Sequence, residues 1–358
     1  AYTGVNDLQR TRITVGTSNW GFRGYEQLNS DLRLVWQLES AFQLDQNTGP
    51  GWGARNNKVG FASNTWGEVN MGQWDSPYKF IGLAINPLRG GYIFDYTPIM
   101  GNPGMGVPAT TTQPGRIGAK PDAAFDKRLG NLIQYWSPKW NGLSFRIANE
   151  VDEGTGPTAA GNPNIRPSIW SANVIWDFGS FSLRYAYEQH KDFFGMSVLG
   201  GGVAGTATNT SSKDEGNKFV AIWKYGGTRV ALDYEMLKYH NSDSVVGHVN
   251  EYKRNAYYVL LEQSFGPHVL WGSFSQAADG DCNIVGGASC ATSNLGANYY
   301  ALGYIYHFSK RTDGYVTYYA LTNKESGQYS VQPVVGTAAA IAPGADIRAF
   351  GVGMLHSF

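Results

Sequence analysis

Residues 167–193 read PSIWSANVIWDFGSFSLRYAYEQHKDF, and this stretch decides the fold. Within 181–188, aromatic and aliphatic side chains at the odd positions alternate with small or charged ones at the even positions. Such a period of two indicates a β-strand with one apolar and one polar face. The FGS sequence at 178–180 is typical of a tight turn. The stretch therefore predicts a hairpin of two strands, 167–178 and 181–193.

The same alternation recurs along the chain, for example in 143–150, 229–236 and 299–308. Counting such segments predicts fifteen strands. They cover approximately 11–28, 32–43, 57–63, 67–75, 128–136, 142–151, 167–178, 181–193, 217–225, 228–240, 253–265, 268–277, 297–309, 313–323 and 345–358.

The predicted strands are joined by short and long connections in strict alternation. Tight-turn sequences lie at 28–31, 64–67, 137–142, 178–180, 226–227, 266–267 and 310–314. Long polar stretches rich in Gly, Pro, Ser and Thr lie at 44–56, 77–126, 153–165, 194–216, 241–252, 277–296 and 324–344. Sorted loop lengths are typical of an up-and-down antiparallel β-barrel that spans a membrane, with its turns at one end and its loops at the other.

The composition fits a barrel whose apolar face meets lipid. Aromatic residues make up 14% of the 358 residues and charged residues only 16%, yet the mean hydropathy is −0.31. No run of 18 apolar residues predicts a transmembrane helix. Composition alone fits a soluble β-sandwich or propeller equally well. The sorted loop lengths argue against a sandwich. A water-soluble barrel of this size could not fill its interior with side chains, so the charged face is expected to line water.

The formal net charge of +0 argues against nucleic acid as a partner, since phosphate binding needs an excess of bases. No signal peptide precedes Ala1, so we expect a mature chain. Cys282 and Cys290 suggest a local disulfide in an oxidising compartment, with two free thiols as the alternative. No Ser/His/Asp or metal-ligand spacing is present, so we expect no enzyme and no cofactor.

Four stretches resemble Gram-negative outer-membrane general porins, in particular the trimeric, anion-preferring porins of β-proteobacteria. Residues 18–42, SNWGFRGYEQLNSDLRLVWQLESAF, are similar to the second and third strands of that family. GARNNKVGF (53–61) and NTWGEVNMGQW (64–74) continue the match in order, and AFGVGMLHSF (349–358) is similar to the family's last strand, which ends in an aromatic residue.

The resemblance implies one barrel domain over 1–358 with 16 strands. Because only fifteen segments are counted, and AYTGVNDLQ (1–9) reads as the end of a strand and its loop, we expect the first strand to be missing or truncated in this chain. Residues 77–126 would form the third loop, folded inward to narrow the pore. The family further implies a homotrimer in the bacterial outer membrane, in contact with its lipid and lipopolysaccharide.

The resemblance also implies the residues of the constriction. By position, Arg55 and Arg128 match arginines of the pore wall, and Gln37 and Glu39 match lumen-facing positions. Asn19 stands where many relatives carry a third arginine. The loop itself offers Arg89 and Asp95 among a slight excess of bases. The predicted selectivity site therefore consists of Arg33, Arg55, Arg128, Gln37, Glu39, Arg89 and Asp95.

A ring of bases in a narrow aqueous pore favours anions. We therefore expect passive diffusion of small hydrophilic solutes with a preference for anions. In the alternative, the arginines only solvate the lumen and pair with Glu39, Glu68 and Glu150. A substrate-specific channel for small organic acids or phosphate is the second hypothesis, and a surface adhesin or barrel enzyme the third.

Two smaller features complete the sequence predictions. Asp279 and Asp281 could hold a Ca²⁺ ion in a loop, although a plain turn is the simpler interpretation. Lys58 and Asn56 are expected on the outward face of strand 57–63. Lipid would penalise a lysine there, so this placement favours a protein–protein interface in a trimer.

Overall fold

The computed structural model describes residues 11, 13, 15, 17–42, 52–87, 94–104, 124–151, 165–195, 207–287, 290, 292–331 and 342–358. Within these residues, sixteen strands form one antiparallel sheet. The strands are β1 (Asn19–Gln27), β2 (Arg33–Ala41), β3 (Asn57–Ser63), β4 (Gly67–Asp75), β5 (Arg128–Trp136), β6 (Leu143–Val151), β7 (Ser168–Phe178), β8 (Phe181–Lys191), β9 (Ser212–Tyr225), β10 (Thr228–Asn241), β11 (Val249–Phe265), β12 (His268–Ala277), β13 (Asp281–Ile284), β14 (Ala297–His307), β15 (Thr312–Asn323) and β16 (Ile347–His356).

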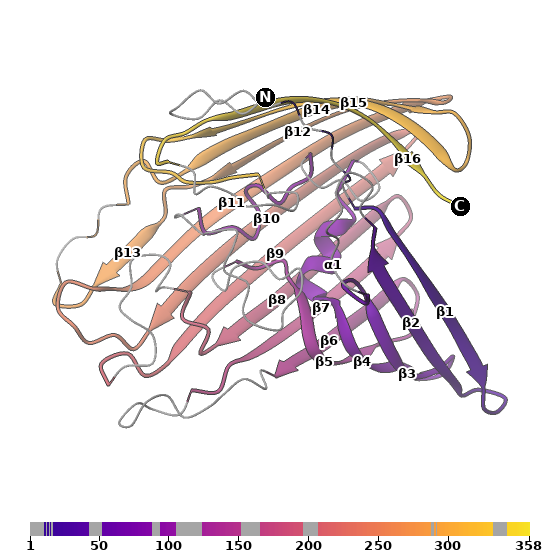
Figure 1. Ribbon diagram of the computed structural model, residues 1–358, viewed down its shortest axis with the longest axis horizontal. Coiled ribbons are helices and arrows are strands. Elements are labelled where there is room, and N and C mark those ends of the chain that lie inside the picture. Colours follow the sequence, from indigo (N-terminus) through magenta and orange to yellow (C-terminus); the bar gives the residue numbers. More distant parts are fainter. Residues whose placement is uncertain are drawn as a thin grey trace.

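The sheet is an up-and-down β-barrel wall, as the sequence predicts. Each strand pairs with its neighbours in the chain, from β1 at one edge to β16 at the other, and only the short β13 lies off this path, where it pairs with β11. The sheet curls around the helix α1 (Pro77–Leu83), which lies on its concave side (Figure 1). No helix in the described part of the chain is long and apolar enough to cross a membrane.

The alternation of faces is confirmed. In β8, Phe181, Leu183 and Tyr185 are exposed on the outside, whereas Ala186 and Glu188 are buried on the inside. The outer surface of the other strands is likewise rich in exposed aromatic and aliphatic side chains. Side chains of that kind are stable outside a barrel only when the surroundings are apolar.

The tight turns form where the sequence places residues that tolerate a positive φ angle. Gly226 and Gly227 have φ angles of 56° and 86°, and Asn141 and Gly142 have φ angles of 46° and 88°. Two successive residues in this region match the twist of the flanking strands of a hairpin.

Several strand boundaries differ from the prediction. β1 begins at Asn19 rather than at 11, β9 begins five residues earlier than predicted, and β11 four residues earlier. β13 lies inside the stretch 277–296 that was predicted to be loop. The expected strand before residue 11 falls outside the described residues.

The helix α1 was not predicted, because it lies in a stretch that reads as loop. Ser76 caps its N-terminus by accepting a hydrogen bond from the Lys79 amide at 3.1 Å, and Pro77 occupies the first turn. Both residues are typical of a helix start. The helix carries the chain of the 77–126 loop away from β4 and into the interior.

Candidate functional site

The described parts of the 77–126 loop lie on the inner side of the sheet, and the first of them is fixed to the wall along the helix α1. The Tyr78 hydroxyl donates to Glu235 at 2.8 Å, and the Tyr78 amide donates to Ser171 at 3.0 Å. At the other end of the helix, Arg229 donates to the carbonyls of Ala84 at 3.1 Å and Asn86 at 2.9 Å. A cation at a helix C-terminus is favourable, because the last carbonyls have no partner within the helix.

The second described part of the loop, residues 94–104, is fixed to β11, to β15 and to the connection that follows β15. Arg254 donates to the carbonyls of Ile99 and Asn102, each at 2.9 Å. Phe94 packs edge-on against Tyr319, with ring centroids 5.6 Å apart. The Gln328 amide, from the connection after β15, donates to the Gly104 carbonyl at 2.9 Å. The described parts of the loop are therefore held against the inner face of the wall, and the narrowing of the pore by residues 77–126 stays a prediction.

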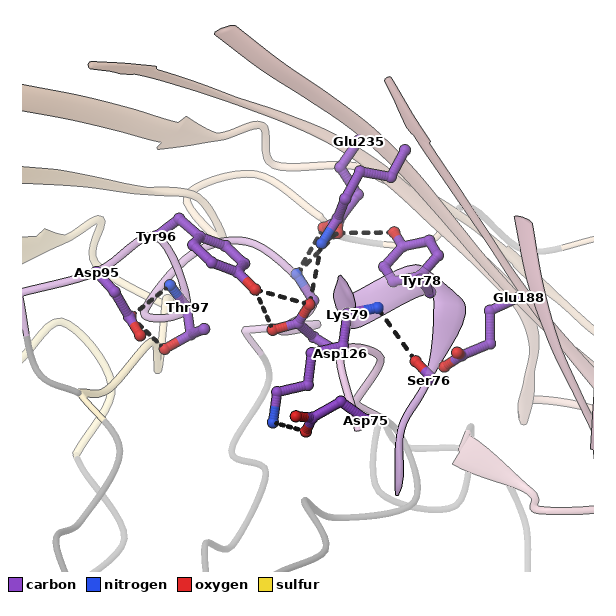
Figure 2. Close-up of polar contacts among 12 residues, drawn as sticks. Asp75, Ser76, Tyr78, Lys79, Asp95, Tyr96, Thr97, Asp126, Glu188 and Glu235 are labelled. Carbon is purple, nitrogen blue, oxygen red and sulfur yellow. Dashed lines mark hydrogen bonds and ion pairs between the residues drawn. The ribbon is translucent and has the colours of Figure 1, made fainter. Parts of the chain in front are cut away.

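A buried ion cluster lies between the loop and the wall (Figure 2). Lys218 lies 3.1 Å from Asp126, and Arg254 lies 3.1 Å from Glu235, and all four side chains are fully buried. Glu235 also accepts the Gly101 amide at 2.8 and 2.9 Å. Breaking one partner of a buried pair leaves an uncompensated charge, which costs about 3–5 kcal/mol. These pairs therefore fix the loop strongly.

Two tyrosines of the loop complete this cluster. The Tyr96 hydroxyl donates to Asp126 at 2.9 Å, and the Tyr78 ring lies 4.3 Å from the Lys218 ammonium. Burial, together with the neighbouring carboxylates, raises the pKa of both Tyr78 and Tyr96 well above the ordinary value. Both hydroxyls therefore stay protonated and remain hydrogen-bond donors.

Four of the predicted selectivity residues come together where the loop leaves β4 and returns to β5. The Arg55 guanidinium pairs with Glu39, and Gln37 donates to the Asn56 carbonyl at 3.1 Å. Arg128 lies 3.3 Å from Asp75. In the same group, Lys79 lies 2.8 Å from Asp75, and Arg128 donates to the Asn56 side chain at 2.7 Å. Three bases thus face two acids.

The other predicted residues lie elsewhere. Arg33 is at the turn end of β2, where it donates to Asn64 at 3.0 Å. Asp95 is buried in the loop and accepts from the Thr97 amide and hydroxyl at 2.9 and 2.6 Å. Arg89 lies outside the described residues. The parts that Arg33, Arg89 and Asp95 play in selectivity stay predictions.

Two inward-facing arginines were missed as pore residues. Arg146 on β6 stacks on the Phe80 ring of α1 at 3.5 Å and on the Trp136 ring at 4.2 Å. Arg184 on β8 donates to Ser182 at 3.0 Å. Within the described part of the chain, neither arginine has a carboxylate within 4.0 Å. Their even positions in 143–150 and 181–188 place them on the polar face of each strand. This alternation could have identified both arginines as residues that line the pore.

The predicted outward placement of Lys58 and Asn56 is wrong. Lys58 pairs with Glu68 and lies 4.0 Å from the Trp136 ring, and Asn56 donates to Asp75 at 2.8 Å. The outward face of β3 consists instead of exposed apolar residues such as Val59 and Phe61. The alternation had been assigned in the wrong phase for this short strand.

At the loop end, a disulfide joins Cys282 of β13 to Cys290. Asp279 accepts from Lys324 at 2.9 and 3.0 Å and from the Gly296 amide at 2.8 Å. Burial alone would raise the pKa of Asp279, but these donors outweigh burial and lower it. Asp281 is largely exposed, 3.8 Å from Lys253. A Ca²⁺ ion at this place stays a prediction.

Comparison with known proteins points to one family. Residues 1–326 match the sequence profile of a family described as Gram-negative porin. A major outer membrane protein (P.IA) of Neisseria meningitidis is 24% identical over 361 residues, which is 98% of this chain and 83% of that protein. An outer membrane porin protein of Bordetella pertussis is 30% identical over 148 residues, but the match spans only 38% of this chain and 32% of that protein.

Solved structures show the same fold. An anion-selective porin from Comamonas acidovorans superposes with a TM-score of 0.72 at 20% identity, over 96% of this chain and 91% of that chain. The trimer form of OmpT, an outer membrane protein of Vibrio cholerae, gives a TM-score of 0.63 at 13% identity, over 98% and 94% of the two chains.

Proposed function

This chain belongs to the Gram-negative porin family, and we propose from that premise that its pore favours small anions over cations. It is an outer-membrane porin, a passive channel and not an enzyme. The proposal concerns which solutes the channel prefers.

The observation that carries the proposal is the pair Arg146 and Arg184. Both guanidinium groups face the interior, and neither has a carboxylate within 4.0 Å among the described residues, although Glu68 acts on Arg146 and Asp177 on Arg184 from farther away. At an effective dielectric constant of about 20, an anion about 6 Å from one guanidinium gains about 3 kcal/mol, less in salt. A cation at the same distance is repelled equally, so two unpaired arginines favour anions.

The group at the root of the loop adds to this effect. Arg55, Arg128 and Lys79 carry three positive charges, and Glu39 and Asp75 carry two negative ones, which leaves a net charge of +1 (3 − 2). This group alone would give a weak preference, because most of its charge is paired. The solved structure from Comamonas acidovorans, which is described as anion-selective, supports the same preference.

Zero-current potentials in a salt gradient test the proposal. Replacing both unpaired arginines (Arg146→Gln with Arg184→Gln) should lower the chloride-to-potassium permeability ratio several-fold, while the single-channel conductance stays of the same order. Lys139→Gln is the matched control, because Lys139 lies at the turn end, is 55% exposed and is paired with Asp177. An unchanged ratio in the double variant would refute the role of these arginines.

A second candidate is a channel with a binding site for small organic acids or phosphate. A polar cavity of about 700 Å³ lies between the end of α1 and the turn end of strands β9 to β12 and β14 to β16. Its lining residues include Lys224, Arg229, Glu262 and His307. Lys224 has no ion-pair partner among the described residues. Saturable block of the chloride current by succinate or phosphate, weakened by Lys224→Gln, would favour this candidate.

We also propose that the chain forms a homotrimer through the outward face of the first strands, with its remaining outer surface in contact with lipid and lipopolysaccharide. Trp20, Phe22, Trp36 and Phe61 on β1 to β3 are exposed large apolar residues. The trimer form of the Vibrio cholerae protein supports the assembly. Chemical cross-linking of the unheated protein in detergent tests it, and a monomer at all protein concentrations would refute it.

A further inference from the structure

Asp233 on β10 is a buried carboxylate without a partner. Its side chain faces the interior, only 2% of its surface is exposed, and neither carboxylate oxygen has a hydrogen-bond partner among the described residues. A buried carboxylate is strongly unfavourable unless an opposite charge or hydrogen-bond donors compensate for it. The surroundings of Asp233 therefore decide what compensates for its charge.

Three hydroxyls lie on the same inner face as Asp233. Tyr258 on β11 stands directly opposite Asp233, and Ser275 on β12 stands directly opposite Tyr258. Ser273 lies two residues along β12 from Ser275, and its hydroxyl approaches that of Tyr258 without a well-formed hydrogen bond. All three hydroxyl oxygens are buried, and none has a well-formed hydrogen bond to another described residue. One carboxylate and three hydroxyls thus form a strip of free oxygen ligands.

The neighbouring cations do not compensate for Asp233. Lys218 acts on it electrostatically, but the Lys218 ammonium is 3.1 Å from Asp126 and 3.8 Å from Glu235. Arg254 is paired with Glu235 at 3.1 Å. Asp126 and Glu235 themselves repel a negative charge on Asp233. Arg229, which also acts on the Tyr258 hydroxyl, is paired with Glu262. Each of these three bases thus has a carboxylate partner other than Asp233, so a small cation would be stabilised beside Asp233.

We propose that Asp233, with the hydroxyls of Tyr258, Ser273 and Ser275, binds a monovalent cation such as Na⁺ or K⁺ between strands β10 to β12 and the inward loop. Carboxylate and hydroxyl oxygens are hard ligands that suit such ions. No group of three or more His, Cys, Asp or Glu side chains in the described residues is arranged to hold a metal, which disfavours a divalent ion.

The bound cation would stabilise the position of the inward loop against the wall. The Tyr96 ring packs edge-on against Tyr258, with centroids 6.4 Å apart. By neutralising Asp233, the ion would reduce the repulsion of Asp126, which the Tyr96 hydroxyl contacts. The ion would therefore stabilise the folded protein in proportion to its occupancy.

Thermal unfolding of the full chain in detergent tests the proposal. The melting temperature is compared in NaCl, KCl and N-methyl-D-glucamine chloride at equal ionic strength. We expect wild type to melt at least about 2 °C higher in one of the alkali salts, with a saturable dependence on its concentration. In Asp233→Asn this difference should disappear.

Two further variants control the test. Asp177→Asn should retain the salt difference, because Asp177 is already paired with Lys139 at 2.7 Å. The double variant Ser273→Ala with Ser275→Ala keeps the carboxylate of Asp233 but removes two hydroxyl ligands. The cation concentration at which half of the melting-temperature increase is reached should rise about threefold or more in this variant. This second measurement tests the proposal if Asp233→Asn does not fold. If wild type has the same melting temperature in all three salts, as expected if Asp233 holds a proton or only water, the proposal is overturned. A salt-dependent difference in melting temperature that persists in Asp233→Asn would overturn it as well.

Discussion

Replacing Glu235 by Gln should weaken the whole attachment of the inward loop. Glu235 accepts hydrogen bonds from the Tyr78 hydroxyl and the Gly101 amide, both in the loop, and pairs with Arg254. Glutamine has nearly the same shape, so the change removes the negative charge with little effect on packing. Arg254 and Lys218 then remain buried with one counter-charge fewer.

The magnitude follows from the burial of these groups. Leaving a buried charge uncompensated costs about 3–5 kcal/mol, and the loss of charge from the remaining hydrogen bonds weakens them further. The free energy of unfolding should therefore fall by about 3 kcal/mol or more. Because the loop is released from the wall, single-channel recordings should also show larger current fluctuations.

Chemical unfolding followed by the fluorescence of the eleven tryptophans measures the change. The matched control is Glu251→Gln, because Glu251 pairs at 2.9 Å with Lys238, whose side chain is 47% exposed. Removing so exposed an ion pair changes stability by no more than about 1 kcal/mol. If Glu235→Gln unfolds within about 1 kcal/mol of wild type and conducts quietly, the buried cluster does not hold the loop.

Three further predictions concern the same loop. Because the folded pKa of Tyr78 and Tyr96 is raised, their contribution to stability should be complete below about pH 10, the ordinary value, and decline only above it. Ultraviolet titration of the folded protein should therefore show at least two fewer ionising tyrosines than titration of the unfolded chain. Gly104→Ala should destabilise the loop and increase current noise, because φ is +79° and the added Cβ would lie 2.0 Å from the Tyr329 ring; noise equal to wild type would contradict this. Arg229→Gln should lower the free energy of unfolding by about 1–3 kcal/mol, because the carbonyls of Ala84 and Asn86 lose a charged donor. An unchanged unfolding curve would contradict this prediction.

The fold could be predicted from the sequence because its main signals are local. Alternation of side chains in 181–188 reports directly which face is outside, and Gly226–Gly227 marks a tight turn wherever it stands. The short strand β13, by contrast, has only four residues and follows Gly280, so no period could be read from it.

The site was predicted only in part, because its partners are distant in the sequence. Arg55 and Arg128 were placed on the wall, but their pairing with Glu39 and Asp75 depends on the register of several strands. The buried cluster was missed altogether, since Lys218 contacts Asp126 across 92 residues of chain. Lys58 was placed on the wrong face because a seven-residue strand gives few positions from which to set the phase of the alternation.

We infer that this porin is an open channel that favours anions. The decisive measurement is the zero-current potential of wild-type protein in a planar bilayer under a tenfold gradient of KCl. We expect an open pore whose zero-current potential is displaced towards the chloride equilibrium potential. Displacement towards the potassium equilibrium potential would contradict it.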